Sequence, residues 1–324
     1  MGKDRSRMLA KLDKNLPAKK YKKGTPAQIR LEFAFEGGTT QYIDIAKALS
    51  QVNRKFYRQG CYYYINSVEM YDNADSVVNL HVCPDNWVTR AAYRKGKALY
   101  DEMTMRAMET VTGDILPVYH DFKVYISELH RTTGSKNVRL NGLNDTGLDL
   151  VSDDWEYSQF VTADYSAGAP ADEFTAHMLG PTTTSGGQID SVGLIESYQK
   201  TRATVPLLGA PNVGNVDPTD PLLNLFDYSS EEVQNDVIDN VSTKGELPPY
   251  ETSIYPGSYA DNHQRVARLV TSAEVGRVVQ EEGFCAPLGL VVVDPLPMSS
   301  ENNFTIVLNL APGTYHGVYA ERMA

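Results

Sequence analysis

Nine lysine and arginine side chains lie within the first 23 residues, with only two carboxylates, Asp4 and Asp13, among them. The nine cations are Lys3, Arg5, Arg7, Lys11, Lys14, Lys19, Lys20, Lys22 and Lys23. This segment has a net charge of +7, whereas the whole chain has a net charge of −11. The remaining 21 cations and 39 carboxylates leave the rest of the chain at −18. Such a concentration of cations is suited to binding phosphate groups.

Polybasic segments bind nucleic acids or anionic membranes, or act as nuclear-import signals. Residues 1–27 contain few apolar side chains and a proline at position 17, so they cannot bury enough surface to fold alone. We expect them to form a largely mobile basic arm that neutralises phosphates without reading base sequence. The alternative is a tail that only improves solubility or derives from purification.

A second set of cations lies on a predicted helix over residues 86–111, which Asp85 or Asn86 can cap. Arg90, Arg94 and Lys97 have i, i+4, i+7 spacing and therefore share one helix face. This face is either an ordinary solvated surface or a second patch that contacts phosphate.

Other residue types that could bind metals or catalyse reactions lack a supporting pattern. The six histidines are scattered without metal-ligand spacing, and the three cysteines, Cys61, Cys83 and Cys285, have no CxxC spacing. The odd cysteine count favours reduced thiols in a core. An acidic cluster comprises Asp145, Asp149, Asp153 and Asp154, but it lacks the calcium-loop pattern of acids at alternating positions with a glycine at the sixth. It predicts a solvated acidic loop, with an intersubunit calcium site as the alternative.

No motif for a phosphate-binding loop, a dinucleotide site, a zinc protease or a serine nucleophile elbow is present in the sequence. No run of about 18 apolar residues is present, so no membrane span is expected. We therefore predict a protein without enzymatic activity, cofactor, metal or membrane partner.

Alternating apolar and polar residues predict many strands, at 28–35, 39–45, 61–72, 76–83, 121–128, 155–164, 172–179, 284–293 and 304–310. Helices are predicted at 46–60, 86–111, 189–202 and 229–241. Because the strands do not alternate regularly with helices, the pattern excludes doubly wound folds. We predict an all-β fold over residues 28–324, a single antiparallel jelly roll (β-sandwich) with a few inserted helices.

Polar segments rich in glycine, proline and asparagine predict long loops near 131–154, 180–188, 203–220 and 243–262. Long loops are unusual in a compact domain unless they have a function. Twenty tyrosines against nine phenylalanines also suit interfaces, where one end of the ring is apolar and the other is wet. These loops and tyrosines indicate a protein that contacts copies of itself or a partner.

Three stretches together resemble the capsid proteins of small circular single-stranded DNA viruses that encode a replication initiator, the CRESS-DNA group. They are "IDIAKALSQVNRKFYRQG", "DNWVTRAAYRKGKALYDEM" and the ending "LAPGTYHGVYAERMA". The resemblance spans most of the chain. It implies a single jelly-roll domain, a small icosahedral shell, and a basic arm that faces inward to the genome. The arm departs from the family pattern because it is short and holds only two arginines.

The sequence therefore favours a capsid subunit that assembles with copies of itself and packages a single-stranded genome, DNA before RNA. Its location would be the virion and, in the host cell, the nucleus or cytoplasm. A basic arm on an acidic domain would separate charge between the inside and outside of a shell. Two alternatives stay open: a monomeric β-sandwich binding module, for example for carbohydrate, and a hydrolase on a β scaffold.

Overall fold

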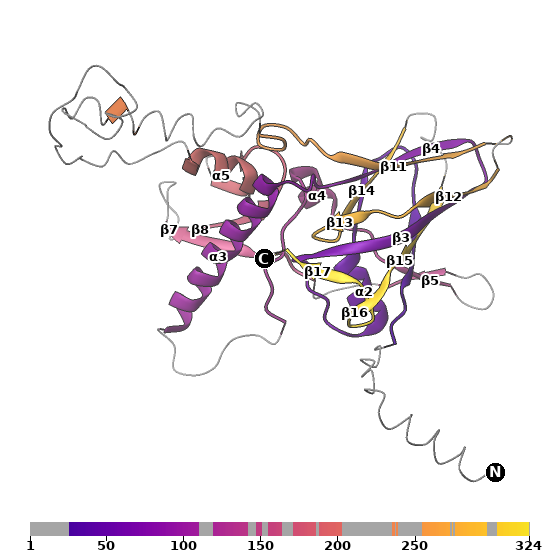
Figure 1. Ribbon diagram of the computed structural model, residues 1–324, viewed down its shortest axis with the longest axis horizontal. Coiled ribbons are helices and arrows are strands. Elements are labelled where there is room, and N and C mark those ends of the chain that lie inside the picture. Colours follow the sequence, from indigo (N-terminus) through magenta and orange to yellow (C-terminus); the bar gives the residue numbers. More distant parts are fainter. Residues whose placement is uncertain are drawn as a thin grey trace, which may run out of the picture.

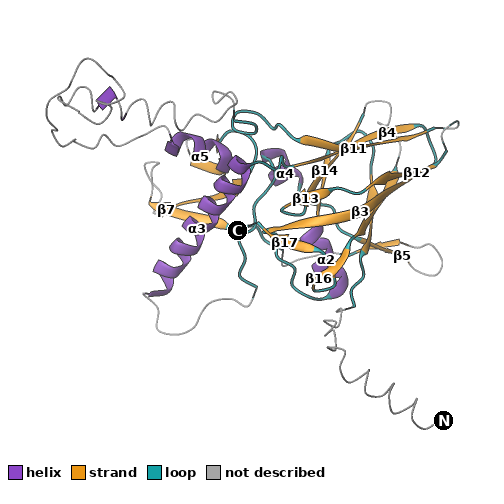
Figure 2. Ribbon diagram, viewed as in Figure 1, coloured by secondary structure: helices purple, strands orange, loops and turns teal. Residues whose placement is uncertain are grey.

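The computed structural model describes residues 26–109, 119–141, 147–150, 155–163, 171–185, 188–202, 235–236, 238, 255–272, 274, 276–296 and 303–323. These residues are mostly β-sheet, in several largely antiparallel sheets, as a β-sandwich requires (Figures 1 and 2). Within the described ranges, no helix is long and apolar enough to cross a membrane.

The first sheet places the last long strand of the chain between two early strands. In spatial order it contains β12 (Val278–Glu282), β3 (Cys61–Asp72), β15 (Phe304–Leu310), β1 (Arg30–Phe35), β5 (Arg139–Asn141) and β6 (Gly147–Asp149). Two short strands, β13 (Cys285–Pro287) and β17 (Ala320–Arg322), pair with the first half of β3. β16 (Pro312–Tyr315) follows β15. All pairings in this sheet are antiparallel.

The second sheet lies across the core from the first. Its order is β11 (Gln264–Thr271), β4 (Ser76–Val82), β14 (Leu290–Pro295) and β2 (Gln41–Asp44), again all antiparallel. Across both sheets, four pairs join strands in a nested way: β1 with β15, β2 with β14, β3 with β12, and β4 with β11. The outermost strands of this series pair with each other and the innermost strands pair with each other, as along one long hairpin.

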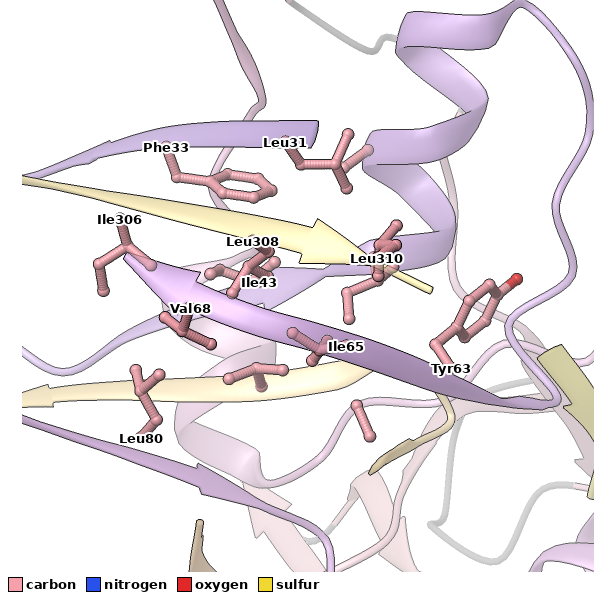
Figure 3. Close-up of a cluster of buried hydrophobic side chains, with 14 of the residues drawn as sticks. Leu31, Phe33, Ile43, Tyr63, Ile65, Val68, Leu80, Ile306, Leu308 and Leu310 are labelled. Carbon is pink, nitrogen blue, oxygen red and sulfur yellow. The ribbon is translucent and has the colours of Figure 1, made fainter. Parts of the chain in front are cut away.

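The core between the two sheets consists of side chains from alternate strand positions. Leu31 and Phe33 of β1, Ile306 and Leu308 of β15, and Ile43 of β2 are fully buried within it (Figure 3). The alternating pattern at 304–310 predicted this, since Phe304, Ile306, Leu308 and Leu310 all lie in the core cluster. The prediction that this strand pairs inside a sheet is confirmed.

Most of the described elements between β4 and β11 form a second layer beside the sandwich, whereas β5 and β6 extend the first sheet (Figure 1). This layer contains a third sheet, β7 (Gln159–Ala163), β8 (Ala171–His177), β10 (Gln188–Gly193) and β9 (Thr183–Ser185), with helices α3 (Trp87–Glu109), α4 (Glu128–Thr133) and α5 (Leu194–Arg202). In this sheet β8 and β10 run parallel. A second apolar cluster, including Tyr93, Phe122 and Ile195, packs this layer against Tyr42 and Val292 of the second sheet.

Several predicted elements differ from the structure. Helix α2 (Ile45–Asn53) ends well before residue 60, because Arg54 adopts a left-handed conformation with φ 51°. The predicted strand at 284–293 is two strands, β13 and β14, separated by Leu288 and Gly289, which both have positive φ. The predicted helix at 189–202 begins only at Leu194, because residues 188–193 pair as β10.

The prediction of a strand over residues 121–128 is wrong. The Val124 backbone N–H donates to Gln59 Oε1 at 2.6 Å, and the Lys123 N–H donates to Ser158 Oγ at 3.0 Å. Side-chain oxygens thus accept the backbone N–H groups that a β-sheet would use. Within 121–128 only Tyr125 forms a β-bridge, and its partner is His177. Ser127 then caps α4.

The predicted loops are partly structured. Residues 131–154 include the end of α4 and the β5–β6 hairpin, and residues 180–188 include β9. The loop at 203–220 lies outside the described residues, as do residues 243–254, whereas 255–262 contain turns and no regular element. Of the helix predicted at 229–241, only residues 235, 236 and 238 are described, and they are helical.

We predict that a chain truncated after residue 300 does not fold in soluble form. Truncation removes β15, which separates β1 from β3 and supplies four fully buried core side chains. Soluble yield and the far-ultraviolet circular dichroism spectrum measure the outcome. Recovery of a cooperatively unfolding truncated protein would contradict this placement of β15.

Candidate nucleic-acid interface

Residues 1–25 of the basic arm proposed to bind phosphate lie outside the described residues, including all nine of its cations from Lys3 to Lys23. The structure does describe where the arm joins the folded domain. The Gln28 N–H donates to Asn53 Oδ1 at 2.7 Å, and Lys55 Nζ donates to the Pro26 carbonyl at 3.0 Å. The Leu310 N–H donates to the Ile29 carbonyl at 2.9 Å. The arm is therefore attached beside the end of β15.

The second cation set lies on α3, as predicted, but its members have partners. Asn86 caps the helix, because its Oδ1 accepts the Thr89 N–H at 2.8 Å. Asp85 instead binds Arg90 in a bidentate ion pair, with Nε–Oδ1 and Nη2–Oδ2 distances of 2.9 and 2.8 Å. This pairing raises the pKa of the Arg90 guanidinium and lowers the pKa of the Asp85 carboxyl.

The other two cations of this set are also engaged. Arg94 Nε donates to the Met323 carbonyl at 3.3 Å, and Lys97 forms an ion pair with Asp101 one turn later. Two of the three charges are thus matched by a local carboxylate. Solvent-exposed ion pairs contribute little to stability, so a phosphate can displace them at little cost. This face of α3 is therefore a weak candidate for binding phosphate.

Aromatic side chains flank this face of α3. The Arg90 guanidinium lies 5.5 Å from the centre of the Tyr62 ring, and the Tyr62 hydroxyl donates to Asp85 Oδ1 at 3.0 Å. Tyr64 follows Tyr62 by two residues on β3, and the centre of its ring lies 4.7 Å from the centre of the Tyr319 ring. Sequence reasoning missed this grouping. The signal was the alternation in "CYYYINS", which places Tyr62 and Tyr64 on the face of β3 opposite the buried Tyr63.

A buried polar network joins the sandwich to the second layer. The Asp44 carboxylate is fully buried and caps α2 by accepting the Lys47 N–H at 3.1 Å. It also accepts hydrogen bonds from Gln59 Nε2 at 3.0 Å, Trp155 Nε1 at 3.1 Å and the Tyr157 hydroxyl at 3.3 Å. Burial raises the Asp44 pKa, although these donors oppose that shift. The four donors offset much of the cost of burying a carboxylate.

The histidine of this network does not activate a serine. His130 Nδ1 accepts the Ile126 N–H at 3.2 Å, so the neutral ring holds its proton on Nε2. Nε2 therefore donates to Ser135 Oγ, 2.6 Å away, and the Ser135 hydroxyl is directed to the Tyr157 oxygen at 2.9 Å. A nucleophilic serine needs the opposite direction, with its proton on the histidine. This chain of hydrogen bonds ends at Asp44 and is structural.

The remaining groups that could react or bind a metal also have a structural role. Cys61 and Cys83 are buried free thiols whose pKa values burial raises to about 11 and about 12. Such thiols are poor nucleophiles. No group of three histidine, cysteine or acidic side chains within the described ranges can hold a metal ion. Of the acidic cluster, Asp149 lies 3.9 Å from Arg139, and Asp145, Asp153 and Asp154 lie outside those ranges.

No protein-family model, curated protein sequence or solved structure matches this chain.

We predict that His130 makes the fold sensitive to acid. Burial lowers the His130 pKa from 6.5 to about 3, so the folded protein keeps the ring neutral where the unfolded chain protonates it. The stabilisation is fully present above about pH 6.5 and is lost as the pH falls toward 3. Between pH 6.5 and 4.5 the loss is roughly 2–3 kcal/mol, measurable by urea unfolding.

The matched comparison uses His130→Gln and the exposed His316→Asn. His130→Gln should lower the free energy of unfolding at pH 7 but reduce the loss of that free energy between pH 6.5 and 4.5. His316→Asn should leave that loss unchanged. If His130→Gln does not fold, proton NMR of the unmodified protein reads the titration of the His130 ring directly. A ring that titrates near pH 6.5 would refute the prediction.

Proposed function

We propose that this protein is a viral capsid subunit that assembles into a small icosahedral shell and packages a single-stranded genome through its basic arm. The observation that carries the proposal is the nested pairing of eight strands in two sheets. The resemblance of three sequence stretches to CRESS-DNA virus capsid proteins favours DNA as the genome. Its place is then the virion and, during infection, the nucleus or cytoplasm of the host.

The strand order supports a jelly roll in particular. Counting β1, β2, β3, β4, β11, β12, β14 and β15 as strands 1 to 8, one sheet contains 1-8-3-6 and the other 2-7-4-5. An order of this kind is expected when one long hairpin is rolled into two facing four-stranded sheets, as in a jelly roll, and it therefore supports that topology. The fold occurs in viral capsid domains, but also in lectins and cupins. Fold alone therefore does not decide between a shell subunit and a binding module.

Exposed apolar side chains support lateral contacts between subunits. Leu99 and Met105 on α3 are 52% and 64% exposed, and Val161 on the edge strand β7 is 49% exposed. All three belong to the segment inserted between β4 and β11. Obligate interfaces are large and more apolar than ordinary surface, so self-assembly accounts for this exposure.

The charge distribution supports genome binding by the arm. The arm has a net charge of +7, while the cations of α3 are largely matched by carboxylates. Lysines at irregular spacing fix no base-edge geometry, so binding is nearly independent of base sequence.

We predict that the protein expressed alone forms particles, either hollow or filled with nucleic acid. Size-exclusion chromatography and negative-stain electron microscopy separate such particles from a species of one subunit. A protein that remains monomeric across concentration, salt and pH would contradict the capsid proposal and favour the monomeric binding module.

We predict that deleting residues 1–23 weakens binding to a labelled single-stranded oligonucleotide without lowering the stability of the folded domain. If all nine cations met phosphate, the log–log salt slope of the full chain would be about −6. A smaller slope is expected, because the arm makes partial contacts and the acidic domain repels phosphate. Fluorescence anisotropy across a salt series measures affinity and slope for both proteins.

The matched variant is Arg90→Gln/Arg94→Gln/Lys97→Gln in the full chain. It removes fewer charges, two of which already have carboxylate partners, so its loss of affinity and slope is expected to be smaller. Equal affinity and slope for the full and deleted chains would show that the arm does not bind the genome.

A further inference from the structure

An open pocket of about 590 Å³ lies beside the Tyr64–Tyr319 ring pair. Besides these two rings, its lining includes Asn66, Glu282 and Phe284. Tyr319 is 42% exposed, and its hydroxyl donates to Glu321 Oε1 at 2.6 Å. We call this site the Tyr64–Tyr319 pocket. It combines π-faces with the Glu282 carboxylate, and Glu321 lies beside it as the partner of Tyr319.

This lining selects against anions. Glu282 and Glu321 are exposed, and neither forms an ion pair with a described residue. None of the side chains that line the pocket is a lysine or arginine. A phosphate group would meet the Glu282 carboxylate, whereas a cation would gain both ion pairing and contact with the aromatic faces. The chemistry therefore fits an ammonium or guanidinium group.

The same face of β3 already holds a cation in this way. Arg90 lies over the Tyr62 ring and binds the Asp85 carboxylate through two hydrogen bonds. Tyr62 and Tyr64 are two residues apart on one strand, so they lie on the same face. The Tyr64–Tyr319 pocket repeats the combination of tyrosine and carboxylate, but with no described cation in it.

The basic arm is attached within reach of the pocket. The Leu310 N–H donates to the Ile29 carbonyl, and the next residue, Ala311, lines the pocket. Lys19 and Lys20 precede Pro26, the outermost arm residue that the domain holds by a described hydrogen bond, by seven and six residues. An extended segment of that length spans roughly 20–25 Å. The chain's own lysines can therefore reach the carboxylates.

We propose that a lysine or arginine side chain of residues 1–23 occupies the Tyr64–Tyr319 pocket of its own chain when nucleic acid is absent. The acidic domain then holds part of the arm, and a single-stranded genome competes for it. This inference rests on the proposed function, because it assigns the regulation of the same arm.

The direct test places the photo-crosslinking residue p-benzoylphenylalanine at position 319 of the full chain. At low salt, mass spectrometry should find crosslinks to residues 1–23, and an unlabelled oligonucleotide should reduce them. The control places the same residue at Tyr71, which is 37% exposed at the far end of β3. Equal arm crosslinking from positions 319 and 71, or none from 319, would overturn the proposal.

A second test compares Glu282→Gln with Glu281→Gln in the full chain. Both variants remove one negative charge from exposed positions of β12, but only Glu282 lines the pocket. Releasing the arm should tighten oligonucleotide binding by Glu282→Gln about three- to tenfold, since apparent affinity scales with the free fraction. Glu281→Gln should change it by less than twofold, and equal effects would contradict specific docking.

The two proposals fail in different ways. A chain that forms no particles and binds no oligonucleotide refutes the proposed function, yet the crosslink from position 319 still tests the pocket. A chain that assembles and binds nucleic acid but shows no such crosslink refutes only the docking of the arm.

Discussion

The arrangement of the whole molecule depends on the burial of β14 on both faces. Val291 and Val293 point into the core between the two sheets, while Leu290 and Val292 point into the second apolar cluster. A strand with this continuous apolar run cannot have one face in water. The helices and third sheet described between β4 and β11 cover this face of the second sheet, and the stability of the sandwich therefore depends on them.

The Asp44 network fixes the position of Trp155 and Tyr157 relative to the end of β2. The carboxylate comes from the end of β2, and its donors come from α2, from residue 59 and from residues 155 and 157 of the inserted segment. Removing one partner would leave a buried charge short of hydrogen bonds, which costs more than an ordinary surface contact. The network thus specifies one position of the inserted segment on the sandwich, where apolar packing alone would tolerate small shifts.

The sequence predicted those features whose causes are local. The helix from Trp87 and the strand at 304–310 follow from periodicity that their own residues contain. The segment at 121–128 was misassigned, because its donors bind Gln59 and Ser158, whose positions no local pattern shows. For the candidate interface, the spacing of Arg90 and Lys97 was visible in the sequence. Their neutralisation by Asp85 and Asp101, and the pairing of Tyr64 with Tyr319, depend on rotamers and on strand order.

The nested strand order has a consequence for synthesis on the ribosome. β1 and β3 are made early, but each needs β15 as its neighbour, and β15 is made long after both. Until then the edges of β1 and β3 that face β15 stay unpaired, and such edges readily pair with other chains. Sheet closure joins residues of very long sequence separation, and such contacts form slowly. Newly made chains are most exposed to misassembly before β15 has paired.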